Sequence, residues 1–143
     1  MASLAPDGPV YQAGTLSGNP LATAAGLATL QELEQPGFYE SLSARTLELT
    51  DGLYRLAAEA GLPFSVAAAG GMFGFVFAEG PVRRFSQVAA ADIPRFRRFF
   101  HAMLAAGIYV APSAFEAGFV SSAHGRDEIS RTHEAARAAF ASA

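Results

Sequence analysis

The 143-residue sequence contains no cysteine, and this absence excludes disulfide bridges, zinc–thiolate sites and thiol catalysis. Charged residues make up only 16% of the sequence and the formal net charge is −3, which is too little to attract nucleic acid or an anionic membrane. The sequence also lacks a membrane-length apolar run and a signal peptide. We therefore expect a cytoplasmic protein whose partners are small molecules or proteins, with no nucleic acid and no membrane among them.

Lysine is absent as well, because all ten basic residues are arginine. An arginine guanidinium stays protonated and is a poor nucleophile, so it cannot replace a lysine amine in covalent chemistry with a carbonyl group. The chain alone therefore cannot carry out any reaction that needs a Schiff base on a lysine side chain.

The apolar residues that are present, 51% of the sequence, follow two periodicities. Helical spacing predicts helices over 20–34, 37–60, 92–106 and 125–141, with Asn19 and Asp92 as N-caps. Strand-like runs at 64–67 and 72–77 predict an antiparallel pair, shorter strands are expected at 108–111 and 119–121, and residues 81–91 are expected to be irregular. The pattern predicts an α+β fold, a small and mostly antiparallel sheet covered by helices.

Small and hydroxyl residues gather in the segment that leads into the first helix. Gly14 and Gly18 allow tight turns and close approach to a ligand, and Thr15 and Ser17 add hydrogen-bond donors. A helix N-terminus favours negative charge, so a phosphate or carboxylate site is one interpretation. Ordinary turn and cap chemistry is the other.

The order of residues in several segments is more specific than these patterns. Residues 8–22 read Gly-Pro-Val-Tyr-Gln-Ala-Gly-Thr-Leu-Ser-Gly-Asn-Pro-Leu-Ala, and residues 111–119 read Ala-Pro-Ser-Ala-Phe-Glu-Ala-Gly-Phe. With residues 71–74, 99–104 and 122–124, they closely resemble the glutamate-1-semialdehyde 2,1-aminomutase family, pyridoxal-phosphate enzymes of the class III aminotransferase group. The resemblance covers essentially the whole chain but only the C-terminal third of that family.

The resemblance implies a fold, a function and partners. The fold is that of the C-terminal domain of fold-type I pyridoxal-phosphate enzymes, with residues 1–36 at the edge of a missing N-terminal large domain and 37–143 as the small domain. The intact family exchanges the amino and oxo groups of glutamate-1-semialdehyde to give 5-aminolevulinate for tetrapyrrole biosynthesis, and it works as a homodimer. Because the family's cofactor lysine belongs to the missing part, we expect this chain alone to be inactive and to bind no pyridoxal phosphate.

The resemblance also assigns site residues. It implies that Gly14 and Thr15 contact the cofactor phosphate in the partner subunit's active site, and that Glu116 faces cofactor and substrate. Independently, an uncompensated carboxylate is expensive to bury in an apolar loop, so Glu116 is either exposed or functional. Ala114 stands where the family often has glutamine, so a polar contribution there is not expected.

Other chemistries find less support. The three histidines lack metal-site spacing, so no metal site is expected, and His133 is interpreted as a partly buried residue with a satisfied hydrogen bond. No Gly-x-Ser-x-Gly elbow accompanies them. Two alternatives stay open, namely another class III aminotransferase and a non-catalytic interaction module.

Overall fold

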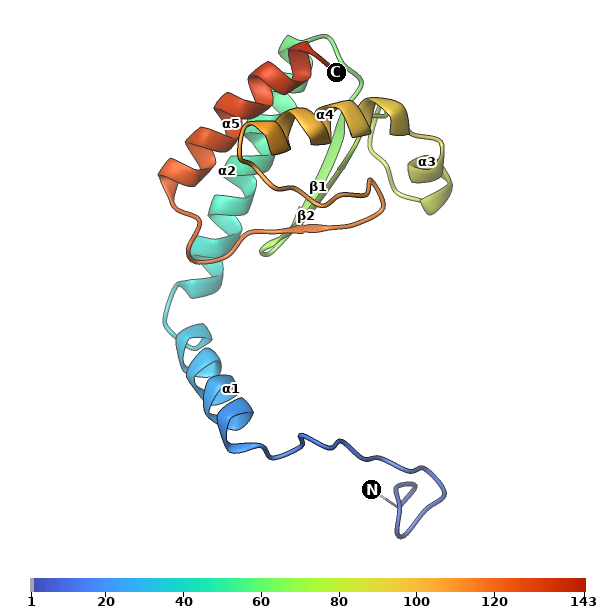
Figure 1. Cartoon of the computed structure of the whole chain (residues 1–143), viewed down its shortest axis with the longest axis vertical. Helices are drawn as coiled ribbons and strands as arrows, with labels where there is room; N and C mark the ends of the chain where they lie inside the picture. Colours follow the sequence, from blue (N-terminus) through green and yellow to red (C-terminus); the bar gives the residue numbers. More distant parts are fainter. Residues whose placement is uncertain (1) are drawn as a thin grey trace. The chain divides into compact units, whose positions relative to one another are not determined.

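Within residues 2–143, which the computed structural model describes, the chain forms five helices and three strands. They belong to two units, one that ends at Phe38 and one over Tyr39–Ala143 (Figure 1). None of the described helices is both long and apolar enough to cross a membrane. The assignment of residues 1–36 to the edge of a large domain stays a prediction.

The first unit consists of an extended lead-in and helix α1, Pro20–Leu33. The side chain of Asn19 accepts hydrogen bonds from the backbone N–H groups of Leu21 (3.1 Å) and Ala22 (3.2 Å), and Pro20 occupies the first helical position. The helix ends before Gly37, whose φ of 79° no β-branched or bulky residue readily adopts. These local signals confirm the predicted helix over 20–34.

The second unit is built on a three-stranded antiparallel sheet in the order β1-β2-β3. Strands β1, Ser65–Ala69, and β2, Met72–Val76, are joined by the Gly70-Gly71 turn, and β3 is Gly118–Phe119. Register pairs Ala67 with Gly74 and Met72 with Phe119. The sheet confirms the predicted antiparallel pair.

Three helices cover one face of this sheet: α2, Phe38–Glu59; α4, Ile93–Ala105; and α5, Arg126–Ala141 (Figure 1). Phe99 of α4 stacks on Phe140 of α5 with ring centroids 4.6 Å apart. Phe99 and Met103 are completely buried, and burial of each contributes about 1.5–3 kcal/mol to folding. The core therefore lies between the helices and the face of the sheet that carries Phe73, Phe75 and Phe77.

Two sequence predictions are wrong in this unit. Residues 108–111 form no strand, because the N–H of Ile108 donates to the carbonyl of Met103 (2.9 Å) and closes the end of α4 instead. Residues 81–91 are not wholly irregular but contain the short helix α3, Phe85–Ala89. The side-chain oxygen of Gln87 accepts hydrogen bonds from the N–H groups of Arg83 (2.9 Å) and Arg84 (3.1 Å), and the second of these is the contact from N3 back to the N-cap residue in a capping box.

Candidate functional site

The segment Gly14–Asn19 is a compact turn in front of α1. The N–H of Ser17 donates to the carbonyl of Gly14 and the N–H of Asn19 to that of Leu16, each at 3.0 Å. Gly18 has a φ of 75°, which favours glycine. A Cβ on Gly14 would lie 2.5 Å from the hydroxyl oxygen of Ser17, whose exposed side chain would have to rotate away.

Few hydrogen-bond donors in this turn are available to an anion. Asn19 already accepts hydrogen bonds from the first N–H groups of α1, so the helix terminus itself offers few free donors. Thr15 lies at the exposed start of the turn, and its hydroxyl has no hydrogen-bond partner among residues 2–143. Any phosphate held by this segment would therefore depend on the Thr15 hydroxyl and the backbone N–H groups of the turn.

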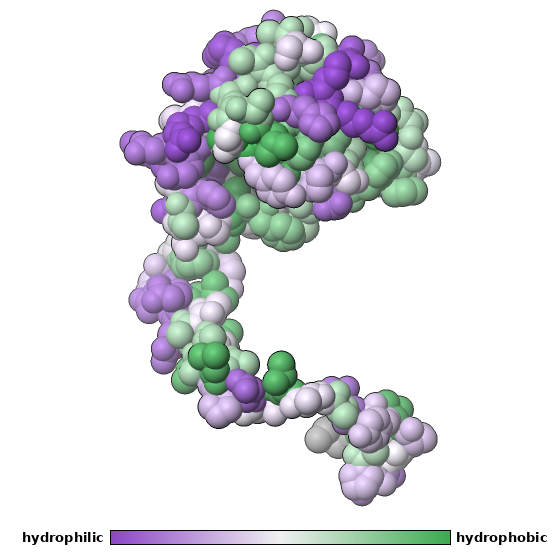
Figure 2. Space-filling view, in the orientation of Figure 1, coloured by the Kyte–Doolittle hydropathy of each residue, from purple (hydrophilic) through white to green (hydrophobic). Residues whose placement is uncertain are grey.

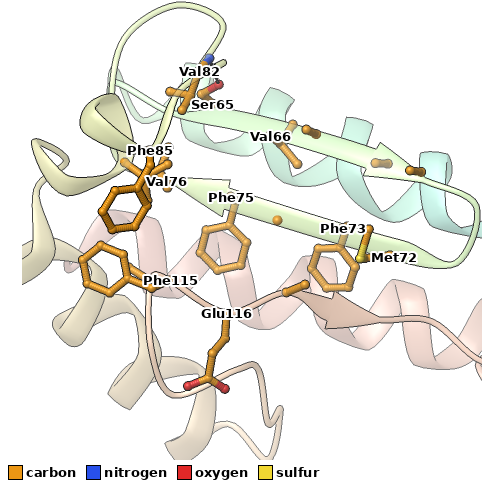
Figure 3. Close-up of a pocket in the computed structure, with 17 residues that line it drawn as sticks. Ser65, Val66, Met72, Phe73, Phe75, Val76, Val82, Phe85, Phe115 and Glu116 are labelled. Carbon is orange, nitrogen blue, oxygen red and sulfur yellow. Dashed lines mark hydrogen bonds between the residues drawn. The ribbon is translucent and has the colours of Figure 1, made fainter. Parts of the chain in front are cut away.

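Glu116 lies in the loop between α4 and β3. The loop is held by hydrogen bonds from the N–H of Glu116 to the carbonyl of Ser113 (3.1 Å) and from the N–H of Phe115 to the Ser113 hydroxyl (3.2 Å). Glu116 is exposed, and in the view of Figure 3 its carboxylate points away from β1 and β2. The cost of burying a carboxylate therefore gives no argument for function, and the resemblance alone assigns Glu116 a role.

A groove of about 380 Å³ lies beside this loop. Strands β1 and β2 form its floor, and Phe85 of α3 and Phe115 form one end, with ring centroids 6.1 Å apart (Figure 3). Near that end, the N–H of Val82 donates to the Ser65 hydroxyl (3.3 Å). Glu116 is the only charged residue among those that line the groove.

This groove was not predicted from the sequence. The sequence does contain an indication of it. Successive residues of β1 and β2 point to opposite faces of the sheet, and those that do not face the core are mostly small and uncharged. The predicted site residues fall in both units: Gly14 and Thr15 in the first, Glu116 in the second.

Histidine has a structural role in the second unit. The Nε2 atom of His133 lies 3.1 Å from the carbonyl oxygen of Leu49, and the residue is partly buried. This contact confirms the interpretation of His133 as a satisfied histidine. Among residues 2–143, no group of three or more His, Asp or Glu side chains is arranged to hold a metal ion.

Comparison with known proteins identifies the family. The model of the family "Aminotransferase class-III" matches residues 1–120. The chain belongs to the class III aminotransferase family. A glutamate-1-semialdehyde 2,1-aminomutase from Laribacter hongkongensis (strain HLHK9) is 59% identical over 141 residues, which are 99% of this chain and 33% of the relative. The chain thus spans about a third of the length of the curated relative that it matches.

Solved structures agree with this assignment. The β-phenylalanine aminotransferase of Variovorax paradoxus is similar with a TM-score of 0.78 and 29% identity, over 92% of this chain and 30% of that chain. The FumI protein of Sphingopyxis sp. MTA144, in its PLP internal aldimine form, is similar with a TM-score of 0.73 and 27% identity, over 92% of this chain and 29% of that chain. The small antiparallel sheet with its helices is therefore the C-terminal domain fold of fold-type I pyridoxal-phosphate enzymes.

The residues of this chain fit only one end of pyridoxal phosphate. The free Thr15 hydroxyl and the backbone N–H groups of the Gly14 turn suit a phosphate group. The aldehyde end needs a lysine amine, and the sequence has none. A complete cofactor site therefore requires residues beyond these 143.

Proposed function

We propose that this chain is the C-terminal third of a glutamate-1-semialdehyde 2,1-aminomutase-like enzyme, which exchanges amino and oxo groups to give 5-aminolevulinate for tetrapyrrole biosynthesis. The observation that carries the proposal is the 59% identity over 99% of the chain to a relative of that name. The proposed enzyme is cytoplasmic, and its large domain and a second subunit complete the site.

In this proposal, pyridoxal phosphate supplies the electron sink for the amino exchange when it is bound. Thr15 donates its hydroxyl to the cofactor phosphate of the partner subunit's site, and the Gly14 turn lets the backbone come close to that phosphate. Glu116 lies beside the substrate, where its charge helps to orient the substrate amine. The chain alone is catalytically silent because it has no lysine.

A chimera tests this function. The part of the Laribacter hongkongensis enzyme that precedes the matched region is fused to residues 1–143, and 5-aminolevulinate production from glutamate-1-semialdehyde is measured. We expect the chimera to be active and Glu116→Gln to lower its kcat/KM by about ten- to a hundredfold, with Glu134→Gln on an exposed part of α5 as the matched control.

The same chimera separates the proposal from its main alternative. Some of the similar solved structures are aminotransferases, including one named for β-phenylalanine. A chimera that binds pyridoxal phosphate, fails with glutamate-1-semialdehyde and transfers an amino group from another donor would assign this chain to a different class III aminotransferase.

A further inference from the structure

The loop that carries Glu116 leaves the core within two residues. Ala114 is 9% exposed and belongs to the hydrophobic core, whereas Phe115 and Glu116 are exposed. A backbone segment at the surface has few packed neighbours, so its conformation depends on local hydrogen bonds. The hydrogen bonds at this point of the chain therefore determine where Glu116 lies.

Ser113 accepts both of the hydrogen bonds that define this turn. Its hydroxyl accepts from the N–H of Phe115 (3.2 Å), and its carbonyl accepts from the N–H of Glu116 (3.1 Å). A serine hydroxyl often bonds in this way to the backbone two residues further along the chain. Every residue type has a carbonyl for the second bond, but the first bond requires a side-chain acceptor at position 113. The partly buried Ser113 hydroxyl is thus the side-chain group that fixes the backbone next to Glu116.

No other described group holds the side chain of Glu116. Its carboxylate makes no hydrogen bond or ion pair among residues 2–143. The neighbouring ring of Phe115 contacts Phe85 of α3, but both rings are more than half exposed (Figure 3). Ser113 and Glu116 also line one small hollow beside Phe96. The position of the carboxylate therefore follows from the backbone turn that Ser113 forms.

We propose that Ser113 is a positioning residue for Glu116 in the amino exchange, and that it acts through the hydrogen bond from the Phe115 N–H to its hydroxyl. This inference rests on the proposed function, in which Glu116 helps to orient the substrate amine. A group displaced by about 1 Å from its working position can lose as much as a hundredfold in rate. Loss of the Ser113 hydroxyl should therefore lower activity although Ser113 itself contacts neither substrate nor cofactor.

The chimera described above provides the test in a complete enzyme. Ser113→Ala should lower its kcat/KM for glutamate-1-semialdehyde by about three- to tenfold, divided between kcat and KM as the loss for Glu116→Gln is divided. Ser113→Thr, which keeps the hydroxyl, should restore most of the activity. In the Glu116→Gln background, Ser113→Ala should change kcat/KM by less than about twofold, because the group that it positions is already lost. Ser130→Ala, at an exposed position of α5, is the matched control and should have no effect in either background.

Measurements on the 143-residue chain follow the loop itself. Water can replace the lost bond at the exposed Phe115 N–H, so Ser113→Ala should change Tm by less than about 2 °C. Hydrogen exchange at the Phe115 amide should nevertheless become about fivefold faster or more. Unchanged exchange at this amide would overturn the positioning role, and so would equal losses of activity from Ser113→Ala in both backgrounds of an active chimera. An inactive chimera would instead reject the proposed function, and this inference with it.

Discussion

Thr15 is the residue of this chain that is best placed to bind the proposed cofactor. Its hydroxyl is free among the described residues, whereas the N–H groups at the start of α1 are satisfied by Asn19. A hydroxyl bonded to a phosphate makes a charge-assisted hydrogen bond, which is stronger than a neutral one. Of the groups in this turn, the free Thr15 hydroxyl is therefore the one whose removal should weaken cofactor binding most.

The prediction for Thr15 is made for a full-length relative with the same turn. Thr15→Val nearly keeps the shape and removes the hydroxyl, so it should weaken pyridoxal-phosphate binding by about 1.5–3 kcal/mol, roughly ten- to a hundredfold. A cofactor titration followed by visible absorbance measures the effect. Ser17→Ala is the control, because the turn uses the Ser17 backbone N–H and not a bond from its hydroxyl. Equal, small losses for both changes would show that Thr15 is only a turn residue.

Gly52 illustrates a residue whose importance is invisible in the sequence. Alanine is normally preferred to glycine inside a helix by about 1 kcal/mol. A Cβ on Gly52 of α2, however, would collide with the imidazole of His133, which also contacts the Leu49 carbonyl. We expect Gly52→Ala to lower the free energy of unfolding by about 1–3 kcal/mol in urea denaturation.

A double-mutant cycle gives the control for this contact. His133→Ala removes the imidazole and leaves room for the new methyl group. Gly52→Ala should therefore stabilise the His133→Ala background, where helix propensity alone acts. Additive effects of the two substitutions would show that the collision does not limit stability.

Glu128 makes the stability of α5 depend on pH. Its carboxylate accepts hydrogen bonds from backbone N–H groups, its own and that of Gly125 (2.8 Å), and these lower the pKa of Glu128 from its usual 4.5. A lowered carboxyl pKa stabilises the fold above the unfolded value, and this contribution is lost as pH falls from about 4.5 through the folded pKa.

We expect Glu128→Gln to make Tm less dependent on pH between about 6 and 3, because glutamine still accepts the bond but does not titrate in this range. Thermal unfolding followed by circular dichroism measures the two profiles. The matched control is Glu134→Gln on the same helix, which should leave the acid decline in place. If Tm of Glu128→Gln fell with decreasing pH as steeply as that of the unchanged protein, the ionisation of Glu128 would not contribute to stability.

At the scale of elements, prediction from sequence succeeded where local residues determine the outcome. Asn19 and Asp92 cap α1 and α4 as expected, the latter by a hydrogen bond from the Arg95 N–H to the Asp92 carboxylate (2.9 Å). Helix α3 was missed although the contact at its start is equally local. Gln87 accepts hydrogen bonds from the N–H groups of Arg83 and Arg84, but the N-cap position is occupied by Arg84, a residue type that N-cap preferences do not favour.

The apolar residues of α4 also show that the sequence does not fully determine which side chains are buried. The helical period of the sequence predicts an apolar stripe of core residues on this helix: Ile93, Phe96, Phe100, Met103 and Leu104. Phe96 and Met103 are buried, but Leu104 is 44% exposed and Phe99 is completely buried. Only the position of α5, whose Phe140 stacks on Phe99, determines which part of an apolar surface faces inward.

Helix α1 is an element without a partner in its own unit. None of its residues is buried, and Leu21, Leu27 and Leu30 are each more than half exposed. Hydrophobic residues lie at the surface of this unit in Figure 2. We expect residues 20–34 either to self-associate or to fray in the isolated chain, because an exposed helix of this length is marginally stable alone. Sedimentation and hydrogen exchange at the amides of 20–34 distinguish these two results.

Leu27→Glu provides the control for this helix. It should abolish any dimer that forms through α1 and leave the unfolding of Tyr39–Ala143 unchanged, because that unit has its own core. A rigid monomer in which the amides of 20–34 exchange as slowly as those of α4 would contradict the prediction.

At the scale of the whole molecule, the candidate site could be predicted only in part. Sequence resemblance pointed to Gly14, Thr15 and Glu116, but of these the structure marks only Thr15, whose hydroxyl has no hydrogen-bond partner among residues 2–143. Glu116 is exposed and has no side-chain partner among residues 2–143, so nothing in the chain itself fixes its role. In the proposed function, the remaining contacts come from the large domain and the second subunit.

The absence of lysine gives the most direct test of this incompleteness. Pyridoxal phosphate reacts reversibly with primary amines, and borohydride makes the product permanent, so mass spectrometry can locate each modified residue. Because the chain has ten arginines and no lysine, we expect no adduct on any side chain and at most weak modification of the α-amino group. The active chimera with the Laribacter hongkongensis large domain is the positive control and should carry one adduct per chain, on a lysine of the fused part. A stoichiometric adduct at an internal residue of the 143-residue chain would contradict the proposal that its cofactor site is incomplete.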